Sequence, residues 1–146
     1  MKMINKNTDY AVRALMGLAK ETGEFVSSRE VGANEKIPLL FLRRILQSLI
    51  RAGLVEAKEG VAGGVRLVHE PRKITVAAVM EIMQGKLTIS DCMFRKKACA
   101  NRRHCVLRKR IQGIEEKVIS EFAAITIQDL LDETRGKDEE KNYHYR

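Results

Sequence analysis

The segment 38–53 constrains the fold more than any other part of the chain. Its apolar residues recur at intervals of three and four positions: Leu42, Ile45, Leu46 and Leu49. This is the spacing of one face of an α-helix. Pro38 suits the first turn of a helix and Gly53 suits the position after its last residue. We therefore predict a helix over residues 38–52 with one buried face.

The opposite face of this predicted helix is polar and basic. At about 100° per residue it carries four side chains that can hydrogen-bond to phosphates or base edges: Arg43, Arg44, Gln47 and Arg51. An exposed stripe of this kind suits the major groove of DNA. An ordinary solvated helix face has the same composition, so the flanking segments must distinguish the two.

The flanking segments predict a specific order of elements. A first helix is predicted over residues 8–20, and the segment 27–30 is typical of a capping box that begins a short second helix. After Gly53, two segments of alternating apolar residues surround three glycines, which predicts a β-hairpin over residues 54–68. Two short helices, a basic-faced third helix and a hairpin form a winged helix-turn-helix.

The rest of the chain is predicted to be helical. A short helix capped by Thr75 ends at Gly85, and a long helix later carries a narrow apolar seam: Leu107, Ile111, Ile114, Val118, Phe122 and Ile125. The seam is most simply buried in a two-fold homodimer, and the alternative is packing on its own winged helix. Residues 126–129 begin a final short helix through Leu131. The charged tail over residues 134–146 is predicted to be disordered.

Charge and composition narrow the class of protein. The 146 residues carry a formal net charge of +8, which suggests a polyanionic partner, although a merely soluble basic domain is the alternative. No apolar run approaches the roughly 20 residues of a membrane span, and no signal peptide is recognised, so we expect a cytoplasmic protein with no membrane partner. No nucleotide-binding glycine motif and no arrangement of His, acid and nucleophile is recognised, so we expect no enzyme.

All three cysteines lie in one cationic segment: Cys92, Cys99 and Cys105. An odd number of thiols in a reducing compartment disfavours a disulfide framework. Residues 95–110 contain eight Lys or Arg and no Asp or Glu, and such a field stabilises thiolates. We expect these thiols to be ligands or sensors.

Taken in order along the chain, these motifs resemble the IscR/NsrR/RirA-type (Rrf) family of winged-helix regulators, over nearly all of residues 1–133. The residues that carry the resemblance are Thr8, Asp9, Tyr10 and Ala11 in the first helix, Leu54 and Val55 before the wing, the wing residues Gly60, Gly63 and Gly64, the two triplets Ile74-Thr75-Val76 and Ile125-Thr126-Ile127, and the three cysteines before a long helix.

The resemblance implies a homodimer that binds a palindromic operator in double-stranded DNA. It also implies an iron–sulfur cluster on Cys92, Cys99 and Cys105, whose state controls DNA binding in response to iron–sulfur or iron status, oxygen or nitric oxide. The nuclearity of the cluster stays open, with [2Fe-2S] favoured over [4Fe-4S]. The expected function is a transcriptional regulator, in the first place a repressor. The residues expected to contact DNA are Ser27, Ser28, Arg29, Leu40, Arg43, Arg44, Gln47, Arg51, Lys58, Gly60, Gly63, Gly64 and Arg66.

The chain departs from the family pattern at the cysteines. Six residues separate Cys92 from Cys99, where members of the family usually have five. The IscR branch has a histidine ligand where this chain has Arg108, which stays protonated and cannot bind iron. The remaining candidates for a fourth ligand are His104 and Asp9, the position from which the NsrR branch supplies a carboxylate across the dimer.

Other interpretations of the three thiols stay open. Cys99 and Cys105 could pair on oxidation, the thiols could bind zinc despite gaps longer than those of structural zinc sites, or they could have no chemical role. The competing function is a cluster-free repressor of the same fold that senses a small sulfur metabolite or thiol oxidation.

The expected fold class is mainly α, a winged helix-turn-helix with a two-stranded β wing and a long C-terminal dimerisation helix. Its parts are a winged helix-turn-helix DNA-binding domain over residues 1–85, a cysteine-containing cluster-binding loop over 86–105, the dimerisation helix and short terminal helix over 106–133, and the tail over 134–146.

Overall fold

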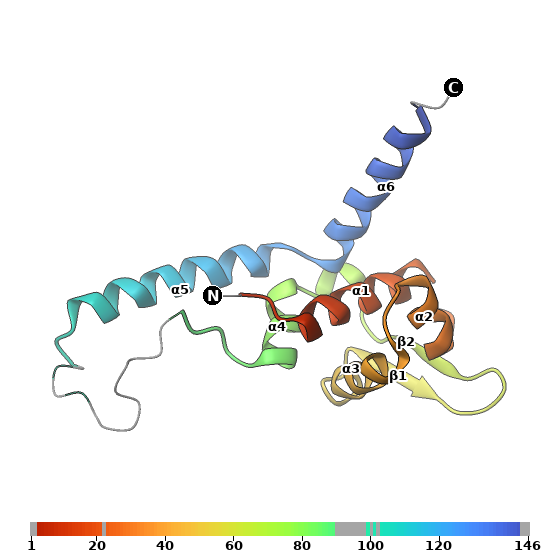
Figure 1. Cartoon of the computed structure of the whole chain (residues 1–146), viewed down its shortest axis with the longest axis horizontal. Helices are drawn as coiled ribbons and strands as arrows, with labels where there is room; N and C mark the ends of the chain where they lie inside the picture. Colours follow the sequence, from red (N-terminus) through yellow and green to blue (C-terminus); the bar gives the residue numbers. More distant parts are fainter. Residues whose placement is uncertain (1–2, 22, 90–98, 100, 102, 144–146) are drawn as a thin grey trace.

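The computed structural model describes residues 3–21, 23–89, 99, 101 and 103–143. Over these residues the elements are α1 (Lys6–Lys20), α2 (Ser28–Asn34), α3 (Leu39–Arg51), β1 (Val55–Lys58), β2 (Gly64–Leu67), the short 3-10 helix η1 (Pro71–Lys73), α4 (Val76–Gln84), α5 (Val106–Ala124) and α6 (Ile127–Tyr143). Figure 1 shows a winged helix-turn-helix body from which α5 and α6 extend. The predicted fold class is confirmed.

The core of the body lies between α1 and α3, with contributions from the base of the wing and from α4 and α6. Leu15 of α1 and both Leu42 and Leu49 of α3 are completely buried, and Val55 and Ile127 close the core from β1 and α6. These apolar side chains occupy one face of each helix, which is how an amphipathic helix gains most of its stability.

The helix boundaries follow from local side-chain chemistry. The Ser27 hydroxyl accepts a hydrogen bond from the Glu30 amide at 3.2 Å, and the Thr75 hydroxyl accepts one from the Ala78 amide at 3.2 Å. Both groups satisfy amides that a helix start leaves free. The residue Gly85 ends α4 with a φ of 79°, a conformation that glycine adopts at little cost. The predicted caps at these positions are confirmed.

The wing is a two-stranded antiparallel hairpin in which Glu56 lies opposite Arg66. An isolated bridge joins Val26, between α1 and α2, to Val65 of β2. The backbone groups of these two valines exchange hydrogen bonds of 3.0 and 2.9 Å. The wing is therefore fixed to the helical body through its second strand.

The two Ile-Thr-apolar triplets of the sequence pair with each other. Thr75 and Thr126 form an antiparallel bridge. The Val76 amide donates to the Ile125 carbonyl at 2.9 Å, and the Ile127 amide donates to the Ile74 carbonyl at 2.9 Å. This short pairing sets the starts of α4 and α6 side by side, so α6 begins on the body.

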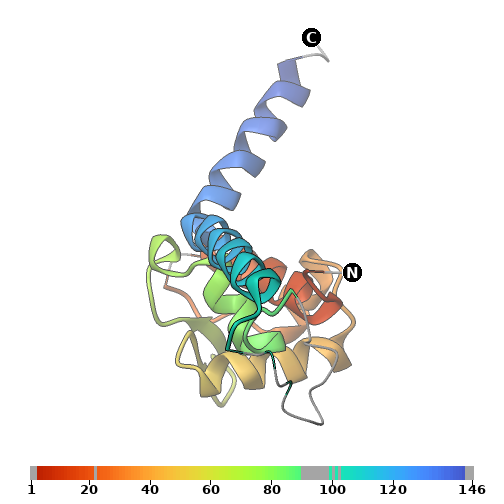
Figure 2. The ribbon, with the colours of Figure 1, turned by 90° about the vertical axis from the view of Figure 1, so that its left-hand side faces the viewer.

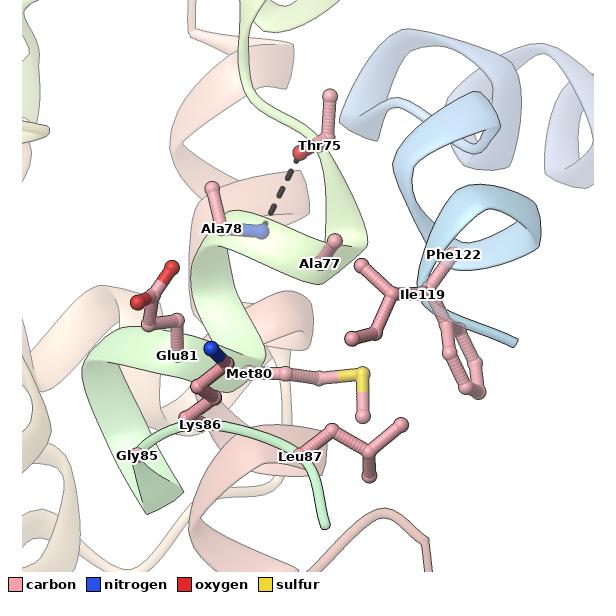
Figure 3. Close-up of a pocket in the computed structure, with 10 residues that line it drawn as sticks. All are labelled: Thr75, Ala77, Ala78, Met80, Glu81, Gly85, Lys86, Leu87, Ile119 and Phe122. Atoms are coloured by element: carbon pink, nitrogen blue, oxygen red, sulfur yellow. Dashed lines mark hydrogen bonds between the residues drawn. The ribbon is translucent and has the colours of Figure 1, made fainter. Parts of the chain in front are cut away.

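The helix α5 lies across α4 on one side of the body, as both views show (Figures 1 and 2). In Figure 3, Ile119 and Phe122 of α5 face Met80 and Leu87, and these residues help to line an open groove of about 350 Å³. The contact involves the C-terminal half of α5, and no residue of α5 is fully buried.

Two features differ from the sequence-based predictions. We predicted a short final helix through Leu131 and a disordered tail from residue 134. Both predictions are wrong for the residues up to Tyr143, because α6 continues to that residue. Many of the added residues are Glu, Lys or Arg, which favour helix once a packed first turn exists. The 3-10 helix η1 has no counterpart in the predictions. Within the described part of the chain, no helix has the length and apolar character to cross a membrane.

Candidate functional site

The helix α3 separates its buried and exposed faces as its sequence predicts. Leu42, Ile45, Leu46 and Leu49 are each at most 4% exposed. The predicted polar stripe faces solvent, and its members are Arg43, Arg44, Gln47 and Arg51. The Arg51 guanidinium donates to the Ser48 hydroxyl at 3.4 Å. Three exposed polar side chains of this face can reach phosphates or base edges: Arg43, Arg44 and Gln47.

The start of α2 holds the three residues predicted to contact DNA before α3. Ser27 and Arg29 are exposed and Ser28 is half-buried. Because the Ser27 hydroxyl already caps α2, its role in the isolated chain is structural. Arg29 leaves its guanidinium free to approach a phosphate from the first helical turn.

The two cations predicted on the wing have different surroundings. Arg66 pairs with Glu56 at 2.5 Å, donates to the Gly23 carbonyl at 3.2 Å and lies 4.4 Å from the centre of the Phe25 ring. Lys58 is exposed, and its ammonium lies 5.7 Å from the same ring. Arg66 is therefore held by the body, whereas Lys58 is available to a phosphate.

The roles of Glu56 and Phe25 have no counterpart among the residues predicted from the sequence. The pairing of Glu56 with Arg66 follows from the hairpin register, in which they are opposite each other, so an assumed register would have indicated it. Phe25 reaches the wing through the bridge between Val26 and Val65, a long-range contact with no local sequence pattern.

The wing glycines have steric reasons to be glycine. A side chain at Gly63 would meet the Lys58 carbonyl, and one at Gly64 would meet the backbone of Val26. Gly60 adopts a φ of 105°. These residues shape the wing backbone, whatever the wing contacts.

An aromatic and cationic cluster joins the start of α1 to the start of α3, and the sequence did not predict it. The rings of Tyr10 and Phe41 lie 6.3 Å apart, and the Lys6 ammonium lies 5.4 Å from the first ring and 5.8 Å from the second. Tyr10 is 8% exposed and Phe41 42% exposed. The cluster fixes one end of α3 on α1.

The cysteines lie at and before the start of α5. Cys99 and Cys105 are free thiols of intermediate exposure. The Cys105 sulfur accepts a hydrogen bond from the Arg108 amide at 3.5 Å and is the N-cap of α5. The positive end of a helix favours a negatively charged group. Cys92 lies outside the described residues.

The candidate fourth ligands are both at the surface. Asp9 is exposed and lies 3.6 Å from the Arg13 guanidinium. His104 is exposed in the turn before Cys105, and its amide donates to the Asn101 carbonyl at 3.0 Å. Over the described residues, no three His, Cys, Asp or Glu side chains come together as a metal site. The donors present, two accessible thiols in a cationic segment, fit an iron–sulfur cluster in chemical type.

Comparison with known proteins places this arrangement in a family. The Rrf2 family, described as "Iron-dependent Transcriptional regulator", matches residues 4–133. The chain belongs to the Rrf2 family. The resemblance inferred from the motifs is confirmed, and Rrf2 proteins are DNA-binding transcriptional regulators and not enzymes.

The relatives of this Rrf2 protein span most of its length. It is 28% identical over 130 residues to the transcriptional repressor NsrR of Streptomyces coelicolor, covering 88% of this chain and 87% of that protein. It is 39% identical over 87 residues to the transcriptional regulator IscR of Cereibacter sphaeroides, covering 58% and 56%. The solved structure of CymR, the global cysteine regulator of B. subtilis, has a TM-score of 0.72 and 22% identity, covering 90% of this chain and 98% of CymR, and it supports the fold.

Proposed function

We propose that this Rrf2 protein is a homodimeric repressor of the cytoplasm, whose binding to a palindromic operator is controlled by an iron–sulfur cluster on Cys92, Cys99 and Cys105. In each half-site α3 lies in the major groove and the wing follows the backbone. The exposed Arg43 and Arg44 contact base edges, and Lys58 contacts a phosphate.

One observation carries the sensing part of the proposal: a candidate ligand caps the helix that joins the two protomers. Cys105 is the N-cap of α5, and its sulfur already accepts the Arg108 amide. The Ile89 amide, after α4, donates to the Glu115 carboxylate of α5 at 2.6 Å. The segment from Ile89 to Cys105 is thus held to α5 at both of its ends.

The same attachment gives a route from the thiols to DNA. A bound cluster would supply a centre whose ligands and charge respond to oxygen, nitric oxide or iron supply. The chain supplies the thiolates, cationic residues around them, and the fixed start of α5. Any shift of α5 relative to α4 changes the separation of the two α3 helices, which must match half-sites one helical turn apart, about 34 Å.

Metal analysis of protein purified without oxygen tests the cluster. We expect iron and sulfide in comparable amounts, visible charge-transfer absorption, and operator affinity that differs between cluster-bound and cluster-free protein at fixed salt. The variant Cys105→Ser keeps an N-cap oxygen for the Arg108 amide and removes the thiol. It should fold and dimerise but lose the absorption. Asp9→Ala and His104→Ala then identify the fourth ligand.

The measurements separate the competing function from this one. An iron-free protein whose operator binding responds to thiol oxidants would indicate the cluster-free repressor, with Cys99 and Cys105 as the reactive pair. Equal operator affinity with and without the cluster would contradict the control mechanism while leaving DNA binding intact.

A further inference from the structure

The line of exposed polar side chains on α3 begins with a large apolar one. Leu40 is 64% exposed and lies in the first turn. It precedes Arg44, Gln47 and Arg51 by four, seven and eleven residues, so at 3.6 residues per turn it lies in line with them. The stripe that faces solvent on α3 therefore begins with an aliphatic group and continues with polar ones.

The packing of the body does not account for an exposed leucine at position 40. The next residue, Phe41, points toward Tyr10 and Lys6, with its ring 6.3 Å from that of Tyr10. Leu42 is completely buried in the core. Single exposed apolar residues are common on proteins, so the place of Leu40 on α3, and not its exposure alone, is the informative observation.

Residues in the first turn of a recognition helix are the ones that approach base edges. The major-groove edges of the four bases carry hydrogen-bond donors and acceptors together with one apolar group, the 5-methyl of thymine. The side chain of a leucine at this position has no hydrogen-bonding atom, so the base-edge group that it matches is that methyl. Arg43 and Arg44, one turn later, suit guanine.

We propose that Leu40 is a specificity-determining residue that contacts the 5-methyl group of one thymine in each half-site. This inference rests on the proposed DNA-binding mode of α3. It adds the chemistry of the base that the first turn recognises, and it does not depend on the cluster.

Replacing thymine by uracil tests the contact, because uracil keeps base pairing and removes only the methyl group. A high-affinity duplex is first selected from random sequences with the full chain, and each thymine is then replaced in turn. At one thymine per half-site we expect the dissociation constant to rise about fourfold, the effect of one buried methyl or methylene group. The variant Leu40→Ala should bind the thymine and uracil duplexes equally.

The control variant is Val68→Ala, which shortens another exposed aliphatic side chain, 48% exposed and outside α3. It should keep the full uracil effect. Absence of a uracil effect at every position with the unaltered protein would overturn the inference. So would a uracil effect that persists in Leu40→Ala, whose folding circular dichroism can verify. Failure to bind any duplex at low salt would instead overturn the proposed function on which the inference rests.

Discussion

At the scale of single residues, Gly64 decides whether the wing can attach to the body. Its φ is 154°, and a side chain there would meet the Val26 backbone beside the bridge to Val65. We predict that Gly64→Ala lowers the free energy of unfolding by about 3 kcal/mol or more, because strain of about 1–3 kcal/mol is added to a collision with backbone atoms. Urea unfolding measures the change.

The matched control is in the same hairpin. Gly60 has a φ of 105° but open space around it, so Gly60→Ala should cost only the backbone strain, about 1–2 kcal/mol. Equal losses in the two variants would show that the contact with Val26 contributes nothing.

Two cations of the proposed DNA-binding surface should have separable effects. Lys58 is exposed at the end of β1, so Lys58→Ala should weaken binding to all duplexes alike and reduce the slope of log affinity against log salt by about one. Arg43→Ala should instead relax the preference at one base pair by about 1–3 kcal/mol. Titration of several duplexes at several salt concentrations separates the two effects.

Arg72→Ala is the control for loss of one positive charge. Arg72 lies on η1, has a side chain 74% exposed and pairs with Glu70 at 3.5 Å. Its removal should leave base preference unchanged and alter the salt slope less than Lys58→Ala does. A change in base preference in the Lys58 variant would contradict the assignment of Lys58 to a phosphate.

At the scale of elements, the start of α6 depends on one carboxylate. The Thr126 hydroxyl and amide donate to the Asp129 carboxylate at 2.7 and 2.8 Å, and the Asp129 amide donates to the Thr126 hydroxyl at 3.1 Å. The hydroxyl hydrogen bond, followed by the amide one, lowers the pKa of Asp129 below its ordinary value. The charged carboxylate therefore stabilises the native state.

This lowered pKa predicts an acid-dependent contribution to stability. Because the folded state holds the proton less tightly than the unfolded chain, the contribution is fully present above the unfolded pKa. It is lost as the pH falls through the lower folded pKa, below about pH 4. The stability difference between the protein and Asp129→Asn should thus be constant near neutral pH and shrink in acid.

Thermal unfolding at a series of pH values measures that difference. The variant Glu133→Gln removes the same charge from the exposed surface of α6, one turn later, and serves as the control. A difference between the protein and Asp129→Asn that stays constant down to pH 2.5 would contradict the role of the Thr126 hydrogen bonds.

The elements that local chemistry determines were predictable from the sequence. Ser27 and Thr75 cap helices within three residues of themselves, so their patterns are complete in short windows. The length of α6 was not predictable from composition, which measures whether a segment can bury apolar surface. Composition does not measure whether a helix that begins with the buried Ile127 and Leu131 will continue.

The candidate site divides in the same way. The two faces of α3 were readable because helical spacing alone assigns them. The contacts of Arg66 with Glu56 and Phe25 could not be predicted, because they depend on strand register and on a bridge between distant segments. For the cysteines, the donor types could be predicted from the sequence. The structural role of Cys105 as the N-cap of α5 could not, because no spacing rule indicates it.

At the scale of the whole molecule, the position of α5 favours an assembly of two chains. Its N-terminal half extends past α4 in Figure 1. Three apolar side chains in that half are largely exposed: Val106 at 72%, Leu107 at 67% and Ile114 at 53%. Among the described residues, the winged helix of the same chain contacts the other half, through residues such as Ile119 and Phe122. Several large apolar side chains exposed on one half of a helix are typical of an interface.

The same geometry links assembly to DNA affinity, so one substitution tests both. In a two-fold dimer a residue near the axis meets its own copy or its neighbours, and Ile114→Glu would bring two carboxylates into an apolar interface. Such juxtaposition costs several kcal/mol, and about 3 kcal/mol corresponds to a hundredfold rise in the dissociation constant of the dimer. Sedimentation equilibrium should show a monomer at micromolar concentration.

The neighbouring variant Gln112→Glu adds the same charge to an exposed polar position of α5 and should remain a dimer. Because the proposed palindromic operator would hold two α3 helices, the monomeric Ile114→Glu protein should lose affinity for the full operator and keep whatever affinity it has for a single half-site. A dimeric Ile114→Glu protein would place the interface elsewhere. A monomer with undiminished affinity for the full operator would mean that the two α3 helices bind DNA independently, and that α5 cannot transmit a change at Cys105 to them.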